Sequence, residues 1–168
     1  SADYLVESFS KTYDLPALIA RPFNTYGPRQ SEKAVIPNII RQIVDDKCKN
    51  LKLGDITTMR DFNYVKDTVD AFIDFSILDS SKVNYGEVYN FASESSYSIK
   101  DVLNLLFEIS GVEKQIILEK SRIRPKKSEV KLLEGNAMKF KKISKWKSKV
   151  SLREGLEKTF LWIKKNKN

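Results

Sequence analysis

The chain has 168 residues, of which 41% are hydrophobic, so it is long enough for one domain with a packed core. A single cysteine and the lack of histidine exclude a disulfide framework and Ser-His-Asp or Cys-His catalysis, and argue against a zinc site. Apolar runs are shorter than the ~20 residues that span a bilayer, and the first residues lack a signal-peptide pattern. We therefore expect a soluble cytoplasmic protein.

The net charge of +8 is unevenly distributed along the chain. Residues 1–119 carry 13 Lys/Arg and 18 Asp/Glu, whereas residues 120–168 carry 17 and 4. A basic segment can bind nucleic acid or another polyanion. Here the lysines alternate with Trp146, Leu152, Leu156 and Phe160, as on the solvated face of amphipathic structure. We expect no nucleic-acid partner, and a polyanion-binding module is the alternative.

Apolar residues recur at helical spacing in some segments and as short runs in others. In chain order these patterns predict helix 2–13, strand 17–21, an Asn/Gly/Pro loop to 29, helix 36–44, strands 51–53 and 60–65, helix 67–77, strand 86–92, helix 98–111, strand 116–118, an extended loop 122–127 and helix 151–162. The alternation predicts an α/β architecture with a mostly parallel sheet.

Polar residues at helix ends support several of these helices. Ser98 with Asp101 three residues later forms a capping-box pattern, and Gly111 is suited to end the same helix. Ser151 precedes the last helix in the same way. Asp67 is expected to cap the helix at 67–77. The expected buried side of that helix comprises Val69, Phe72, Ile73 and Phe75.

The most informative segment is RPFNTYGPR, at residues 21–29, which follows the apolar strand. In open α/β sheets, ligands bind outside the carboxyl ends of the strands. Asn24 is therefore a candidate ligand-binding residue. The alternative is a turn residue, because Asn favours turns whatever the function.

Five motifs in order carry a family resemblance: SADYLVESF, RPFNTYGPR, TMRDFNYVKD, GEVYNFAS and ISKWKSKVSLREGLEKT. Together they resemble the extended short-chain dehydrogenase/reductase family, and most closely its NAD-dependent nucleotide-sugar 4,6-dehydratases. The likeness covers the whole chain but only the C-terminal half of such an enzyme. It implies that the catalytic Tyr-x-x-x-Lys and the Gly-rich phosphate loop lie before Ser1. The chain alone is therefore expected to be inactive, poorly soluble and marked by exposed apolar faces and a strand edge.

The resemblance also divides the chain into two parts. Residues 1–30 and 57–93 would form the C-terminal portion of a Rossmann-type, NAD-binding domain with a parallel sheet. Residues 31–56 and 94–168 would form a small α/β domain that binds the sugar nucleotide.

Six site residues follow from the same resemblance. Pro22 and Phe23 would line the nicotinamide pocket, with simple packing as the alternative. Asn24 would bind the substrate diphosphate and Arg60 a substrate phosphate, where a surface arginine is the alternative. The remaining two would contact the substrate: Val35, through its backbone, and Asn90.

Two more candidates lie in RPKKSEVKLLEGN, at residues 124–136. This segment resembles R-P-x-E-V-x-L-L of GDP-mannose 4,6-dehydratases, whose Arg binds phosphate and whose Glu binds the ribose. Arg124 and Glu129 would take these roles, although two extra residues separate Arg-Pro from Glu-Val here. A basic loop without a ligand is the alternative.

As a whole, the resemblance implies conversion of a nucleoside-diphosphate hexose to its 4-keto-6-deoxy form, with NAD as cofactor. The expected partner is a GDP-sugar or a UDP/dTDP-sugar, and the full-length enzyme is expected to be a homodimer in polysaccharide biosynthesis. A sugar-nucleotide epimerase or decarboxylase of the same family is the alternative.

Overall fold

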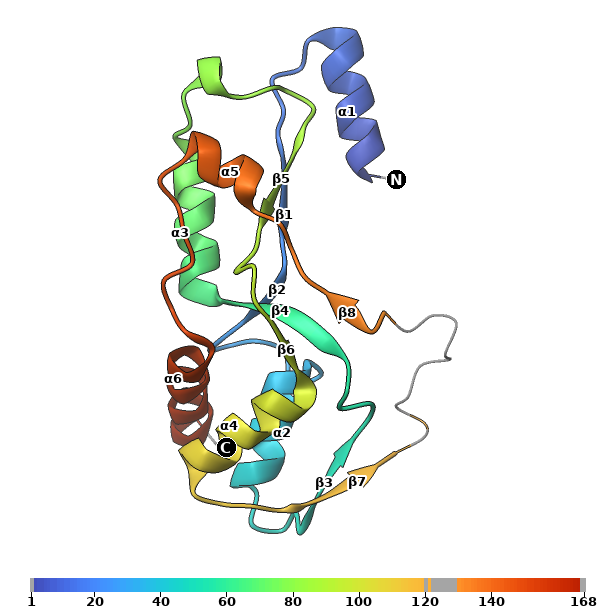
Figure 1. Cartoon of the computed structure of the whole chain (residues 1–168), viewed down its shortest axis with the longest axis vertical. Coiled ribbons are helices and arrows are strands. Elements are labelled where there is room, and N and C mark those ends of the chain that lie inside the picture. Colours follow the sequence, from blue (N-terminus) through green and yellow to red (C-terminus); the bar gives the residue numbers. More distant parts are fainter. Residues whose placement is uncertain (1, 120, 122–129, 167–168) are drawn as a thin grey trace.

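The computed structural model describes residues 2–119, 121 and 130–166. The molecule is elongated, with α1 at one end and α2, α4, β3 and β7 at the other (Figure 1). The elements in order are α1 (Ala2–Tyr13), β1 (Ile19–Pro22), β2 (Asn24–Tyr26), α2 (Val35–Val44), β3 (Asn50–Leu53), β4 (Met59–Tyr64), α3 (Val65–Ser76), η1 (Ser80–Lys82), β5 (Val88–Phe91), β6 (Ser96–Ser98), α4 (Ile99–Ser110), β7 (Gln115–Leu118), β8 (Leu132–Leu133), α5 (Met138–Ile143) and α6 (Leu152–Lys165).

The strands form three small sheets that are mostly parallel. β1 pairs with β5, β3 pairs with β7, and β4 lies between β2 and β6 and also pairs with β8. All of these pairings are parallel except that of β4 with β6. The expected α/β class with a mostly parallel sheet is therefore confirmed.

The buried side chains form two separate cores. In the orientation of Figure 1, the lower region comprises β2, α2, β3, β4, α4, β7 and α6, around a core that includes Ile39, Leu103 and Leu156. The upper region comprises α1, β1, α3, β5 and α5, with a smaller core around Tyr89, Phe91 and Phe140. None of the described helices is both long and apolar enough to cross a membrane.

The predicted helix ends are confirmed in the lower region. The Ser98 side chain accepts a hydrogen bond from the backbone N–H of Asp101, and the Asp101 carboxylate accepts one from the N–H of Ser98. Gly111 ends α4 with φ 67°, a left-handed conformation that glycine adopts at little cost. Ser151 accepts from Glu154 at the start of α6. These contacts are local, so the sequence alone can predict them.

The prediction for α3 was wrong in two respects. Asp67 lies inside the helix rather than at its N-cap, which is Tyr64. Val69, Phe72 and Ile73 are exposed rather than buried, whereas Asp67 is buried. Helical periodicity identifies which face is apolar but cannot show whether another element covers that face.

Among the described elements, five were not predicted, namely β2, β6, β8, α5 and the short 3-10 helix η1. β2 occupies part of the expected loop: Asn24 begins this strand and pairs with Phe62 of β4. The chain passes from β1 in the upper region to β2 in the lower region through the single residue Phe23. The N–H of Phe23 donates to the Phe91 carbonyl at 2.9 Å. Such short strands depend on partners far away in the sequence, so local patterns do not show them.

Candidate functional site

A cavity of about 690 Å³ opens in the lower region. It is bounded by β2, the N-terminus of α2, the end of β3, the middle of β4 and residues 130–133. Three of the predicted substrate residues line it together: Asn24, Val35 and Arg60. They are separated by up to 36 positions in the sequence, and the parallel pairing of β2 with β4 brings two of them to one place.

Asn24 is fixed in the wall by a hydrogen bond to the neighbouring strand. Its side-chain amide Nδ2 donates to the Asp61 carbonyl at 3.0 Å. This bond orients the side chain of a residue that lies at the start of β2 and lines the cavity. The structure thus places Asn24 in a strand at the cavity, not in a free turn.

Arg60 lies in β4 and brings a permanent positive charge to the cavity. Its Nη1 donates to the carbonyl of Met59 at 2.8 Å and to that of Val130 at 2.7 Å. These bonds hold the guanidinium against the cavity wall. The position differs from an exposed surface arginine, which was the alternative from sequence.

Val35 is the first residue of α2, and Ala34 is its N-cap. Ala34 provides no side-chain cap, and the first turn of α2 contains no acidic residue. The first N–H groups of a helix lack partners within it and, with the helix dipole, favour an anion. Ala34, Val35 and Ile36 all line the cavity, so this helix end faces the same space as Arg60.

Sequence reasoning missed six polar residues that line the cavity: Thr25, Gln30, Lys33, Asn38, Asp55 and Thr58. Nε2 of Gln30 donates to the Thr25 carbonyl at 2.8 Å, while its Oε1 is buried with no hydrogen-bond partner in the described structure. The Thr57 hydroxyl and N–H bind the Asp55 carboxylate and hold its pKa below the usual range, so it stays charged. The only signal for Gln30 and Lys33 was their closeness to the RPFNTYGPR motif.

The cavity also has an apolar floor, to which Tyr26, Phe62 and Ile99 contribute. Tyr26 is buried, and its hydroxyl donates to the Leu152 carbonyl at 3.2 Å. Burial raises the pKa of this phenol, so it stays neutral at physiological pH. Tyr26 therefore ties the floor to α6 and is not poised to lose a proton.

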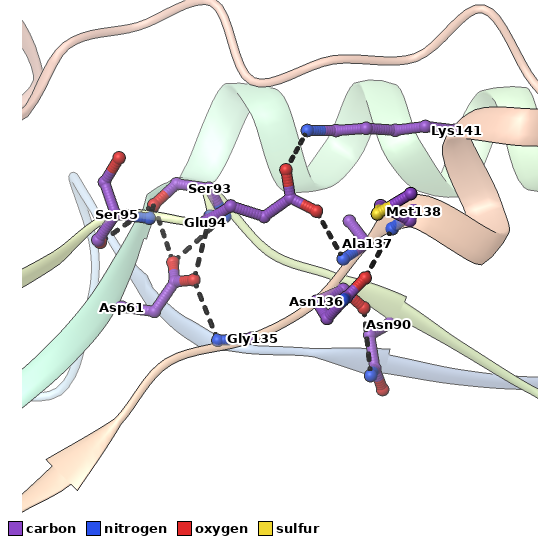
Figure 2. A network of polar contacts seen from close by, with 10 residues as sticks. All are labelled: Asp61, Asn90, Ser93, Glu94, Ser95, Gly135, Asn136, Ala137, Met138 and Lys141. Carbon is purple, nitrogen blue, oxygen red and sulfur yellow. Dashed lines mark hydrogen bonds and ion pairs between the residues drawn. The ribbon is translucent and has the colours of Figure 1, made fainter.

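Three other predicted residues, Pro22, Phe23 and Asn90, lie outside the cavity, in the upper region. Pro22 is exposed at the carboxyl end of β1, and Phe23 follows it, half-buried beside the upper core. Asn90 lies within β5, and its Nδ2 donates to the Asn136 carbonyl at 3.2 Å (Figure 2). Arg124 and Glu129 lie outside the described residues.

The chain is similar to known proteins over nearly its whole length. The family model described as GDP-mannose 4,6 dehydratase matches residues 1–159. GDP-6-deoxy-D-mannose reductase of Pseudomonas aeruginosa is 30% identical over 160 residues, which are 93% of this chain and 51% of that protein. dTDP-D-glucose 4,6-dehydratase of Mus musculus is 31% identical over 173 residues, covering 99% of this chain and 46% of the mouse protein.

A solved structure gives the same result. The UDP-glucuronic acid 4-epimerase of Bacillus cereus, in complex with UDP-glucuronic acid and NAD, superposes with a TM-score of 0.87 at 31% identity. The superposition covers 99% of this chain and 51% of that one. The chain thus spans about half the length of the relatives it matches.

Proposed function

The chain belongs to the GDP-mannose 4,6-dehydratase family, and from this premise we propose that it forms the sugar-nucleotide-binding half of an NAD-dependent 4,6-dehydratase. The proposed reaction converts a nucleoside-diphosphate hexose to its 4-keto-6-deoxy form. The proposed substrate is a GDP-sugar or a UDP/dTDP-sugar.

The cavity that joins Asn24, Val35 and Arg60 is the observation that carries this proposal. Its volume of about 690 Å³ falls within the usual range for small-molecule sites. The wall offers an arginine, an oriented side-chain amide and the N-terminus of α2, all of which favour phosphate oxygens. The apolar floor gives a nucleotide base or sugar ring a surface to pack against.

The role of these residues is to bind and orient the substrate rather than to react with it. No Tyr-x-x-x-Lys occurs in the sequence. Binding energy at the nucleotide-diphosphate end positions the distant sugar for the chemical step. The chain alone is therefore expected to bind the nucleotide without turnover, and turnover by the isolated chain in a dehydratase assay would contradict this.

The family resemblance and the NAD-bound relative support NAD as the cofactor of the proposed reaction. Pro22 and Phe23 fit one wall of a nicotinamide site, since they lie at the carboxyl end of the parallel β1–β5 pair, where ligands bind. They could not hold a dinucleotide unaided, because the sequence contains no G-x-G-x-x-G. When bound, NAD supplies hydride transfer.

The remaining parts of the proposal concern the whole protein. Residues 1–30 and 57–93 would belong to the cofactor domain, and residues 31–56 and 94–168 to the substrate domain. A cytoplasmic homodimer fits a family that acts on soluble sugar nucleotides. Asn90 is proposed to contact the substrate from β5, although in this structure its amide is bonded to Asn136.

Calorimetric titration of the chain with UDP-glucose, dTDP-glucose and GDP-mannose tests the binding proposal. We expect one of the three to bind, and Arg60→Ala to weaken it by about 10- to 100-fold, because a hydrogen bond to a charged group contributes about 1.5–3 kcal/mol. Arg153→Ala is the matched control, since Arg153 forms an exposed ion pair with Glu108 outside the cavity. Failure of all three sugars to bind the wild type would refute the proposal.

An epimerase is the second candidate, because a UDP-glucuronic acid 4-epimerase superposes on nearly the whole chain. NMR analysis of the reaction product distinguishes a dehydratase from an epimerase. The assay needs the segment that carries the catalytic Tyr-x-x-x-Lys together with this chain. A dehydratase yields a 4-keto-6-deoxy sugar nucleotide, whereas an epimerase yields a C4 epimer that keeps its 6-substituent.

A further inference from the structure

Residues 130–141, here called the strap, run from the cavity to the upper region (Figure 1). Val130 and Leu133 line the cavity. The Lys131 carbonyl accepts from the Met59 N–H at 2.7 Å, and β8 pairs with the start of β4. The Arg60 guanidinium also donates to the strap, through the Val130 carbonyl. The place of Arg60 and the shape of one cavity wall therefore depend on where the strap lies.

Hydrophobic burial does not hold this part of the strap in place. Val130 is 52% exposed, Leu132 56% and Leu133 41%. β8 itself comprises only two residues. A segment with few buried apolar contacts opens locally at low cost. Ala137 and Phe140, further along the strap, are buried in the upper core, so it is the part before Ala137 that depends on polar contacts.

Asp61 provides the first such contact from the neighbouring position of β4. Its side chain is fully buried, and Oδ2 accepts from the N–H groups of Gly135 at 3.2 Å and Glu94 at 3.0 Å. Oδ1 accepts from the N–H and hydroxyl of Ser93 (Figure 2). Successive strand residues point to opposite faces, so Arg60 lines the cavity while Asp61 binds the strap behind it.

Glu94 provides the second contact, two residues further along the strap. Its carboxylate accepts from the Ala137 N–H at 2.8 Å and pairs with the Lys141 ammonium at 2.6 Å (Figure 2). Glu94 has a φ of 60°, a left-handed conformation that is uncommon for a residue other than glycine. The hydrogen bond from its N–H to Asp61 helps to hold that backbone conformation. Asp61 therefore supports Glu94, and Glu94 in turn binds the strap.

Gly135 shows how closely the strap approaches the loop after β5. A Cβ atom at this position would lie 2.3 Å from Cβ of Ala92 and 2.9 Å from the Phe23 ring. The strap therefore has no room to move inward by even one methyl group. Close contact with Ala92 and Phe23 prevents the strap from moving inward, and the hydrogen bonds to Asp61 and Glu94 oppose its movement outward.

We propose that Asp61 and Glu94 are positioning residues of the binding site: they anchor the strap so that residues 130–133 close the cavity and hold Arg60 at its wall. The predicted effect on nucleotide affinity rests on the proposed function. The anchoring of the strap does not, and it can be measured without a ligand.

Amide hydrogen exchange followed by NMR on the chain tests the anchoring, with Asp61→Asn and Glu94→Gln. We expect the amides of residues 131–137 to exchange about tenfold faster or more, as the loss of one hydrogen bond would give, with α4 and α6 unchanged. Asp70→Asn is the matched control, because Asp70 forms an ion pair with Lys66 on α3, away from the strap. Glu94→Asp should restore part of the protection.

The affinity arm uses UDP, dTDP and GDP as probes. For whichever binds the wild type, Asp61→Asn and Glu94→Gln should raise the dissociation constant about tenfold, well below the unfolding temperature. If exchange in the strap stays unchanged, or rises equally in α4 and α6, the positioning role is refuted. If no probe binds the wild type, the proposed function fails, while exchange still decides the anchoring. If the buried Asp61→Asn variant does not fold, Glu94→Gln still tests the anchoring, because Glu94 is only half-buried and its substitution disturbs the core less.

Discussion

The two regions of the molecule differ in how completely they cover their apolar side chains. In the lower region, α4 buries Ile99, Val102, Leu103 and Leu106. In the upper region, α1 buries only Ser10, and its Leu5 is 60% exposed. On α3 the expected core residues Val69, Phe72 and Ile73 are exposed as well. The exposed apolar faces expected from the sequence are thus present on α1 and α3, while smaller exposed sites lie elsewhere, for example at Leu118 of β7 and Leu161 of α6.

This contrast matters because the candidate site is divided between the two regions. The cavity with Asn24, Val35 and Arg60 lies in the lower region, which holds the larger of the two described cores. Pro22 and Phe23, the proposed cofactor contacts, lie beside the open apolar faces. We therefore expect the chain to retain nucleotide binding more readily than cofactor binding.

The largest expected effect comes from comparing the same substitution in both regions. Leu106→Ala should lower the free energy of unfolding by about 3 kcal/mol, because it leaves a cavity in the lower core. Leu5→Ala on α1 should change it by less than about 0.5 kcal/mol, since that side chain is mostly exposed. Urea unfolding followed by circular dichroism measures both. Similar losses would show that the upper region packs as tightly as the lower one.

The next effect concerns Asp67, which joins the two regions. From α3, its carboxylate accepts from the Ser148 hydroxyl and from the N–H groups of Lys149 and Val150, just before α6. Asp67→Ala removes the buried carboxylate that these three donors share and should cost about 2 kcal/mol.

The same denaturation series checks the Asp67 prediction. Asp70→Ala, at a half-buried position of the same helix, is its control, because its ion pair with the exposed Lys66 is expected to contribute less than about 0.5 kcal/mol. If Asp67→Ala unfolds in one transition at the same urea concentration as the wild type, contacts other than those of Asp67 hold the two regions together.

A smaller effect is expected when acid protonates the Glu94 carboxylate that holds the strap. The Lys141 ammonium, followed by the Ala137 N–H, holds the pKa of the Glu94 carboxyl below its usual range. A lowered pKa in the folded state stabilises the fold above the pKa of the unfolded chain, about 4.3, and this stabilisation is lost as pH falls through the folded value. The strap should therefore loosen below about pH 4.

The Ala137 amide signal in an NMR pH titration reports this loosening. Asp101 in the capping box of α4 also has a lowered pKa, so acid loosens more than one contact. Glu94→Gln isolates the strap, because that variant should lose the pH dependence at Ala137 but keep it at α4. Retention of the dependence in Glu94→Gln would assign it to another group.

The sequence predicted what local interactions determine. The capping box of Ser98 and Asp101 and the end of α4 at Gly111 lie within one stretch of chain, and the structure confirms them. β2 was missed because its stability comes from β4, 38 positions away in the pairing of Asn24 with Phe62. The burial of α3 was wrong because periodicity does not reveal what covers a face.

The site was predictable only in part for the same reason. Asn24, Val35 and Arg60 came from motifs and proved to line one cavity. Gln30 and Lys33 enter it through the path of the loop before α2, which no local pattern specifies. Asp61 and Glu94 look like ordinary surface acids in the sequence. Their importance depends on the strap, which meets them about 40 to 75 positions later in the chain.

The proposed function requires the lower region to bind the diphosphate of a sugar nucleotide through its cavity. An NMR titration of the ¹⁵N-labelled chain with UDP, dTDP and GDP tests it most directly. We predict that one nucleotide shifts the Asn24 side-chain amide and the backbone amides of Lys33, Ala34 and Val35, while the amides of α1 and α3 stay unchanged. Shifts that centre on α1 and α3, or no shift with any of the three, would contradict the account.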